Sequence, residues 1–195
     1  MNIAIVLLLA LAPSLTGAQQ APLPAVELID QKLDPTGGQI LKPRDWFYKS
    51  RSNATGLDWS LSSEDPSKGP YSTGFSIQLV IKARETVKQD LEPYCKSFLE
   101  WKQKSTKLVT LFPLTKGISN QGGFTRQGIE VVEQGTGNRS GKLYHCTYSM
   151  MWSTSFDMIV ITVFETPEEQ WSSLKQVQQA MSQFELFGAD FLKKK

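Results

Sequence analysis

The two residues best suited to chemistry stand next to each other. His145 is the single histidine of this 195-residue chain, and Cys146 follows it directly. A thiol activated by an imidazole is a familiar enzymatic nucleophile. Residues 142–152, however, have the alternating pattern of a β-strand, and neighbouring strand residues project to opposite faces of a sheet. We therefore expect no Cys-His dyad at this pair.

The other reactive residue types are too few or too scattered to form a recognisable site. A structural zinc site needs about four ligands, whereas the chain offers one histidine and two distant cysteines. A serine triad also needs a histidine, and the sequence marks no partner for His145. Glu168 and Glu169 are explained by the start of a helix. We expect no catalytic residue, no metal site and no cofactor.

The glycine-rich loop at 135–142 resembles a phosphate-binding loop only at first sight. A Walker motif has glycine five residues before its Gly-Lys pair, Ser or Thr after the lysine, and then a helix. Thr136 and Leu143 occupy these two places, and a strand pattern follows. A hairpin loop is the better interpretation.

Two cysteines, Cys95 and Cys146, make up the whole cysteine content. In an oxidising compartment an even number of cysteines favours a disulfide, so we expect a Cys95–Cys146 bridge. A pair of buried free thiols is the alternative, because cysteine is among the most frequently buried residue types.

Two further groups of residues are candidates for binding or modification. Aromatic residues could line a pocket between sheet and helix, although such clusters are more often core; they are Trp46, Trp59, Tyr71 and Trp152. The triplets that begin at Asn53 and Asn138 match the glycan-acceptor pattern. They are acceptors only if the host is eukaryotic.

The first residues predict export. Residues 3–12 form an unbroken apolar run, too short to cross a bilayer comfortably, and small residues at 16–18 suit cleavage after Ala18. A retained N-terminal anchor is the alternative. We expect a signal peptide at 1–18, a flexible leader at 19–40, a domain at 41–188 and a basic tail at 189–195. The mature protein would be secreted or periplasmic.

The charge balance gives no reason to expect nucleic acid as a partner. The chain has 21 Lys and Arg against 19 Asp and Glu, a net charge of +2. No apolar run after the signal peptide approaches membrane-spanning length, so we expect no membrane span after cleavage.

The elements that must position these residues form a mixed α and β pattern. We predict strands at 57–64, 74–83, 107–114, 124–134, 142–152 and 156–165, and a helix at 91–104. The strand at 156–165 is apolar on both faces, so layers should cover it on both sides. A Thr-Pro-x-Glu capping box at Thr166 begins a last helix, which Gly188 ends. The fold class is α+β, a three-layer α/β/α sandwich around a mainly antiparallel sheet.

Several local patterns resemble the PsbP-like family over residues 41–187. They include Pro43-Arg44-Asp45-Trp46 before the first strand, Tyr71-x-Thr73-Gly74 before the second, and Phe164-x-Thr166-Pro167-x-x-x-Trp171 at the last helix. The resemblance implies an α/β/α sandwich. It places no metal-binding or partner-contacting residue on this chain, and a shared fold does not transfer function.

Two functions follow as hypotheses. The first is an exported, non-catalytic protein-binding or assembly module whose partner is unknown. The second is a small-ligand binder or hydrolase with a pocket between sheet and helix.

Overall fold

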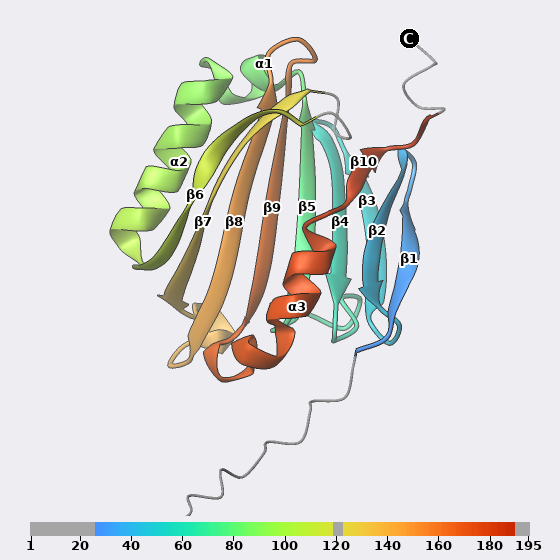
Figure 1. Ribbon diagram of the computed structural model, residues 1–195, viewed down its shortest axis with the longest axis vertical. Helices are drawn as coiled ribbons and strands as arrows, with labels where there is room; N and C mark the ends of the chain where they lie inside the picture. Colours follow the sequence, from blue (N-terminus) through green and yellow to red (C-terminus); the bar gives the residue numbers. More distant parts are fainter. Residues whose placement is uncertain (1–25, 119–122, 190–195) are drawn as a thin grey trace, which may run out of the picture.

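The computed structural model describes residues 26–118 and 123–189. Seven strands in this part of the chain form one sheet in the order β3-β4-β5-β9-β8-β7-β6, and every neighbouring pair is antiparallel (Figure 1). Their bounds are β3 Phe47–Asn53, β4 Gly56–Ser62, β5 Gly74–Ile81, β6 Lys107–Ile118, β7 Phe124–Gln134, β8 Leu143–Ser153 and β9 Met158–Pro167. The predicted α+β class with a mainly antiparallel sheet is confirmed.

A second, smaller sheet corrects the predicted flexible leader. Strands β1 (Leu28–Leu33), β2 (Gly37–Pro43) and β10 (Glu185–Phe187) pair in the order β1-β2-β10. Leu33 and Ile40 are buried in the core. Residues 28–40 are therefore part of the domain, because strand pairing and apolar burial offset the entropy lost on ordering them. The prediction was wrong because β2 pairs with its neighbour β1 on one side and, on the other, with β10 from the far end of the chain.

Helix α2 (Leu91–Ser105) covers one face of the large sheet at β7 and β8. The short helix α1 (Ala83–Val87) precedes it. Leu91, Cys95 and Leu99 recur every four residues on one side of α2, and all three are buried. They pack in a cluster with Ile129, Val131, Cys146, Tyr148 and Met150 of the sheet. The helix predicted at 91–104 is confirmed.

Helix α3 (Trp171–Met181) and the small sheet cover the opposite face. Val177 and Met181 of α3 share a core cluster with Trp59 of β4, Phe75 of β5 and Phe164 of β9. The layers are thus α2, the large sheet, and α3 together with the small sheet. This is the predicted three-layer sandwich.

Neither covering layer extends over the whole sheet. Helix α2 contacts β6, β7 and β8, whereas α3 contacts β2 and β9 (Figure 1). Two parts of the large sheet are therefore less covered than its centre. One is the face of β6 and β7 on the α3 side, and the other is the face of β3 and β4 on the α2 side. Each of these two regions is hollowed into a cleft.

The start of α3 differs from the predicted capping box. Thr166 and Pro167 end strand β9, the 3-10 turn η3 (Glu168–Gln170) follows, and α3 begins at Trp171. Thr166 pairs with His145 in the ladder, and its hydroxyl lies 3.1 Å from that of Thr73. The threonine is thus held in the sheet instead of capping the helix. The helix also ends at Met181, before β10, and not at Gly188.

No helix in the described residues is long and apolar enough to span a membrane. The predicted signal peptide at 1–18 and all but the first residue of the predicted tail at 189–195 lie outside the described residues.

Candidate functional site

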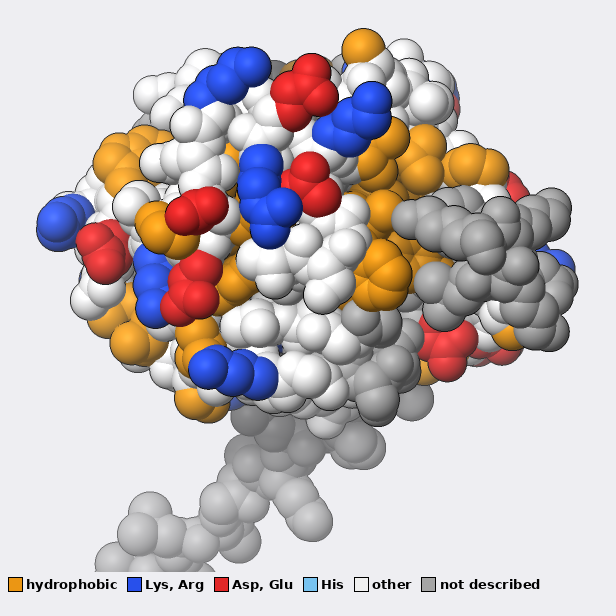
Figure 2. Space-filling model, turned by 90° about the horizontal axis from the view of Figure 1, so that it is seen from above, with side chains coloured by type: hydrophobic (Ala, Val, Ile, Leu, Met, Phe, Trp, Pro, Cys, Tyr) orange, Lys and Arg blue, Asp and Glu red, His pale blue; other side chains and the backbone are white. Residues whose placement is uncertain are grey.

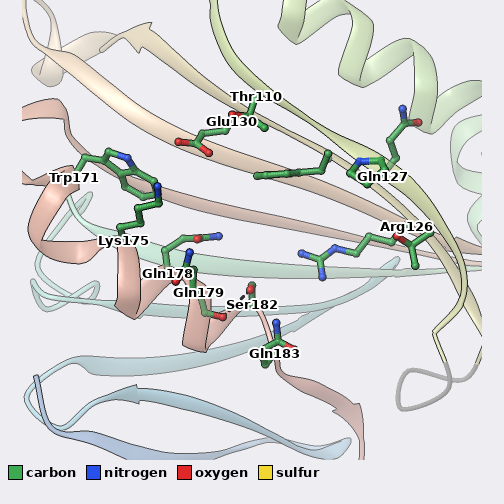
Figure 3. Close-up of a pocket in the computed structure, with 14 residues that line it drawn as sticks. Thr110, Arg126, Gln127, Glu130, Trp171, Lys175, Gln178, Gln179, Ser182 and Gln183 are labelled. Carbon is green, nitrogen blue, oxygen red and sulfur yellow. Dashed lines mark hydrogen bonds between the residues drawn. The ribbon is translucent and has the colours of Figure 1, made fainter.

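A cleft of about 500 Å³ separates α3 from strands β6 and β7 (Figure 3). Its volume lies in the range of small-molecule sites. Its lining is mostly polar and includes Thr110, Arg126, Glu130, Lys175, Gln178 and Gln183. A pocket between sheet and helix was predicted, but these are not the residues that the sequence suggested for it.

Polar side chains of β8 are buried on the face of the sheet that this cleft uses. His145, Thr147 and Ser149 alternate along the strand, and all three are buried. Gln178 of α3 donates through Nε2 to Thr147 Oγ1 at 3.2 Å, and Arg126 of β7 donates through Nε to Ser149 Oγ at 2.8 Å. Buried polar groups are costly unless they are hydrogen-bonded. This face therefore depends on partners from two other elements.

The His145 ring is held between two carboxylates. Nε2 lies 2.7 Å from Glu130 Oε1, and Nδ1 lies 2.8 Å from Glu168 Oε2. The Trp171 indole stacks on the imidazole, with ring centroids 3.9 Å apart and planes 8° from parallel. His145 itself is only 3% exposed. The structure thus supplies three partners that the sequence did not mark.

These partners come from three elements. Glu130 lies on β7, Glu168 on η3, and Trp171 opens α3. One of them could have been found in the sequence, because the predicted hairpin between 124–134 and 142–152 places Val132 opposite His145. Glu130 is then a diagonal neighbour on the same face.

The arrangement around His145 fixes the ring in place. Both ring nitrogens face carboxylates, and when both carry protons each donates to one of them. Within residues 26–118 and 123–189, no hydroxyl is hydrogen-bonded to His145. Ser182, a hydroxyl that lines the cleft, donates to the carbonyl of Gln179 at 2.8 Å. The geometry is therefore unlike that of a base-activated nucleophile.

Arg126 stands out among the cations of the cleft. It projects from β7 into the cleft (Figure 3). No carboxylate of the described residues forms an ion pair with it. Burial lowers the pKa of its guanidinium. By contrast, Arg139 is also withdrawn from water, but its ion pair with Glu165 at 2.8 Å raises its pKa.

The predicted disulfide is corrected by the structure. Cys95 and Cys146 are both free thiols, although they belong to the same core cluster. Cys146 Sγ donates to Glu133 Oε1 at 3.6 Å instead. Burial raises the pKa of Cys95 to about 12, and burial together with nearby Glu133 raises that of Cys146. The alternative of two buried thiols describes the molecule.

The same side of the sheet holds a polar network beneath α2. Lys102 lies 2.9 Å from Glu133 Oε2 and donates to the Tyr148 hydroxyl at 2.7 Å. That hydroxyl donates to Glu133 Oε1 at 2.6 Å. Burial would raise the pKa of Glu133, but these hydrogen bonds prevail and lower it.

The four aromatic residues suggested for a pocket do not gather. Trp46 and Trp59 are buried in the core under α3, whereas Trp152 is buried in the cluster under α2. Tyr71 lines a different cleft of about 420 Å³, together with Lys49, Arg51, Arg139 and Glu165. The sheet separates Trp152 from the two core tryptophans, so the four residues form no common pocket.

The two predicted glycan acceptors lie at different turns. Asn53 ends β3, is exposed, and accepts a hydrogen bond from the Thr55 amide at 2.9 Å. Asn138 lies in the 3-10 turn η2 (Gly137–Arg139), between β7 and β8.

Five large apolar side chains are exposed on α2 and on the edge strand β6, and we refer to them together as the apolar patch. The patch consists of Trp101 from α2 and of Leu108, Val109, Leu111 and Leu114 from β6. Trp101 is 59% exposed and Leu111 is 52% exposed. Strand β6 is an edge strand, so one of its sides has no neighbour among the described strands.

Charged side chains of both signs are mixed on one end of the molecule. Figure 2 shows Lys and Arg interspersed with Asp and Glu on the end of the molecule that carries α1. Such mixing produces no single-sign surface of the kind that nucleic acid requires on this end.

Comparisons with known proteins show similarity in fold. No protein-family model matches the chain, and no curated protein sequence does. Among solved structures, cyanobacterial PsbP from Synechocystis sp. PCC 6803 is 14% identical with a TM-score of 0.49, covering 84% of this chain and 94% of its own. The Ran-binding protein Mog1p of Saccharomyces cerevisiae is 13% identical with a TM-score of 0.48, covering 86% and 99% respectively.

Protein PA94 of Pseudomonas aeruginosa is 13% identical with a TM-score of 0.40, covering 80% of this chain and 94% of its own. At these identities the likeness concerns the fold alone, and neither binding nor activity follows from it. Cyanobacterial PsbP is thus among the structures to which the chain is similar, in line with the PsbP-like resemblance of its sequence.

Proposed function

We propose that this chain is a non-catalytic protein-binding module and that the apolar patch on α2 and β6 is its docking surface. The observation that carries the proposal is the exposure of five large apolar side chains in neighbouring elements, namely Trp101, Leu108, Val109, Leu111 and Leu114. Contiguous exposed apolar surface is typical of sites that bind other proteins. An exposed tryptophan at such a site is a frequent anchor of binding energy.

The details of β6 favour docking through side chains over the addition of a strand. Pro113 has no backbone N–H to donate, and the pairing of β6 with β7 shifts register at three places. Proline, bulges and lysines are features that keep an edge strand from pairing with another chain. The partner would therefore contact the apolar side chains and leave the backbone edge unpaired.

The charge around the patch favours a different protein over a second copy. Residues 101–118 contain Lys104, Lys107 and Lys116 but no Asp or Glu, while Lys102 in the same range is paired with Glu133. Two copies that met through this surface would bring like charges together, which opposes association. The partner we propose presents an apolar surface with acidic residues at its rim.

Export remains part of the proposal and rests on residues 1–18 alone. Intact-mass measurement of the protein from its own host tests this directly. We expect the mature chain to begin at Gln19. A chain that keeps its first 18 residues would contradict cleavage and favour a retained anchor.

Affinity capture with three variants tests the docking surface. The wild type, Leu111→Ser in the patch, and Leu143→Ser at an exposed site on β8 are used as baits in the secreted or periplasmic fraction of the host. We expect one stoichiometric protein with the wild type and with Leu143→Ser, and its loss with Leu111→Ser. Equal capture by all three would refute the patch as the docking surface. Light scattering should show a monomer, and a dimer that Leu111→Ser abolishes would show self-association instead.

A second candidate, binding of a small molecule, is favoured by the cleft between α3 and the sheet. Most of its lining residues are polar, and its Arg126 forms no ion pair with a described carboxylate. Hydrolysis has no corresponding support, because the described hydroxyls make no hydrogen bond to His145.

A further inference from the structure

The cleft combines a partly buried guanidinium with neutral donors and a second cation. Arg126 reaches into it from β7, Lys175 and Gln178 line it from α3, and Gln183 lines it from the turn after α3 (Figure 3). Ser149 takes up only Nε of the guanidinium, at 2.8 Å. A guanidinium offers five N–H donors, and no hydrogen bond from the others to a described residue accompanies this one, so the outer edge is available for a ligand as far as residues 26–118 and 123–189 are concerned.

The described chain provides no charge to balance Arg126. Two other partly buried cations have a carboxylate partner: Lys102 pairs with Glu133 at 2.9 Å, and Arg139 pairs with Glu165 at 2.8 Å. Buried Lys42 has none among the described residues but donates to three backbone carbonyls. Burial lowers the pKa of Arg126, and its hydrogen bond to Ser149 brings no opposite charge. A bound anion would supply the missing compensation.

The carboxylate within the cleft is already engaged. Glu130 is held by His145 Nε2 at 2.7 Å. Figure 3 shows its carboxylate on the Trp171 side of the cleft, with the Arg126 guanidinium apart from it. The part of the cleft near Arg126 is therefore left with a positive charge and neutral amide groups.

We propose that this cleft binds the oxyanion of a small molecule, a carboxylate or a phosphate, with Arg126 as its main ligand and Lys175 as a second charge. Planar guanidinium groups bind such anions through two parallel hydrogen bonds, whereas an ammonium group acts as a point charge. Gln178 and Gln183 supply neutral hydrogen-bonding groups at the rim. The inference rests on the second candidate function and is independent of the apolar patch.

Titration calorimetry of the full chain with two probes, inorganic phosphate and succinate, tests the proposal. We expect saturable binding of at least one probe, and the better probe identifies which oxyanion the cleft prefers. Arg126→Gln should raise the dissociation constant about tenfold or more, since hydrogen bonds to charged groups contribute strongly. Lys175→Gln should raise it by a smaller factor.

Arg51→Gln is the matched control, because it removes the same charge from the other side of the sheet. Binding should be unchanged in this variant. Arg126→Lys keeps the charge but not the two parallel bonds, so weakened binding there supports the same conclusion if Arg126→Gln does not fold. Absence of binding for both probes would overturn the proposal. Equal weakening by Arg51→Gln and Arg126→Gln would also overturn it, because it would indicate general attraction of anions.

Discussion

The two faces of strand β8 are both buried, yet they are built from different chemistry. On the α2 side, Cys146, Tyr148 and Met150 pack against the apolar side of the helix. On the α3 side, His145, Thr147 and Ser149 occupy the alternate positions and are just as well buried. The α2 face is held mainly by apolar contact, with one polar network around Glu133. The α3 face is held by hydrogen bonds from β7, η3 and α3.

This difference shows that a buried position on a strand does not always belong to the hydrophobic core. Apolar packing on the α2 side gains free energy from every atom removed from water. The polar face loses hydration for each group and recovers it only through correctly placed partners. A sheet face with that cost, next to a cleft, is a reasonable place to look for binding. We therefore expect different effects from substitutions on the α2 face and on the α3 face of β8.

The largest effect should come from the apolar face. Met150→Ala removes a fully buried side chain, and we expect a loss of about 2–5 kcal/mol in the free energy of unfolding. Denaturant unfolding measures it. Leu143→Ala, at an exposed site on the same strand, is the control and should change stability by less than about 0.5 kcal/mol. A loss for Met150→Ala as small as that of the control would mean that the α2 face is loosely packed.

The next largest effect should come from the polar face. His145→Ala removes the group between Glu130 and Glu168 and the ring that stacks on Trp171. We expect a loss of about 1–3 kcal/mol, because the Glu130 carboxylate is left without its partner in a largely buried position. His145→Gln keeps one donor and should lose less. If both variants were as stable as the wild type, the network would contribute nothing to folding.

Glu133 gives a pH-dependent prediction on the α2 side. Because hydrogen bonds from Tyr148 and Lys102 outweigh burial and lower its pKa in the fold, the folded state binds protons less readily than the unfolded state. Its contribution to stability is therefore present above the ordinary glutamate pKa of about 4.3 and is lost as the pH falls through the lowered folded value.

Glu133→Gln removes the charge and leaves an amide of similar size. We expect a loss of about 1–2 kcal/mol near neutral pH that shrinks in acid, measured by unfolding at several pH values. Glu100→Gln, at an exposed position on α2, is the control. A difference from the wild type that stayed constant with pH would show that Glu133 acts through packing and not through its charge.

The last prediction is that reduction leaves the stability of the protein unchanged. Cys95 and Cys146 are free and buried, so a reducing agent should leave the unfolding midpoint unchanged. Non-reducing mass spectrometry after alkylation of the unfolded protein should count two thiols. A lower midpoint on reduction would indicate a disulfide and a rearranged contact between α2 and β8.

The pattern of the central strands was visible in the sequence because it is local. Alternation assigned Cys146 and His145 to opposite faces, and the two-sided apolar run of β9 required cover on both sides. The same local reasoning placed α2 within one residue of its observed end. It misplaced the start of α3. The Thr166 hydroxyl contacts that of Thr73, the residue before β5, and does not cap the helix that follows.

The sequence by itself thus determined the mixed sandwich, the strands at its centre and the separation of His145 from Cys146. Each of these depends on periods of two or about four residues along the chain. Only the tertiary structure decided that β1 and β2 join β10 in a second sheet, that the thiols remain free, and that Glu130, Glu168 and Trp171 meet at His145. These features depend on contacts between distant segments, and no local pattern encodes such contacts.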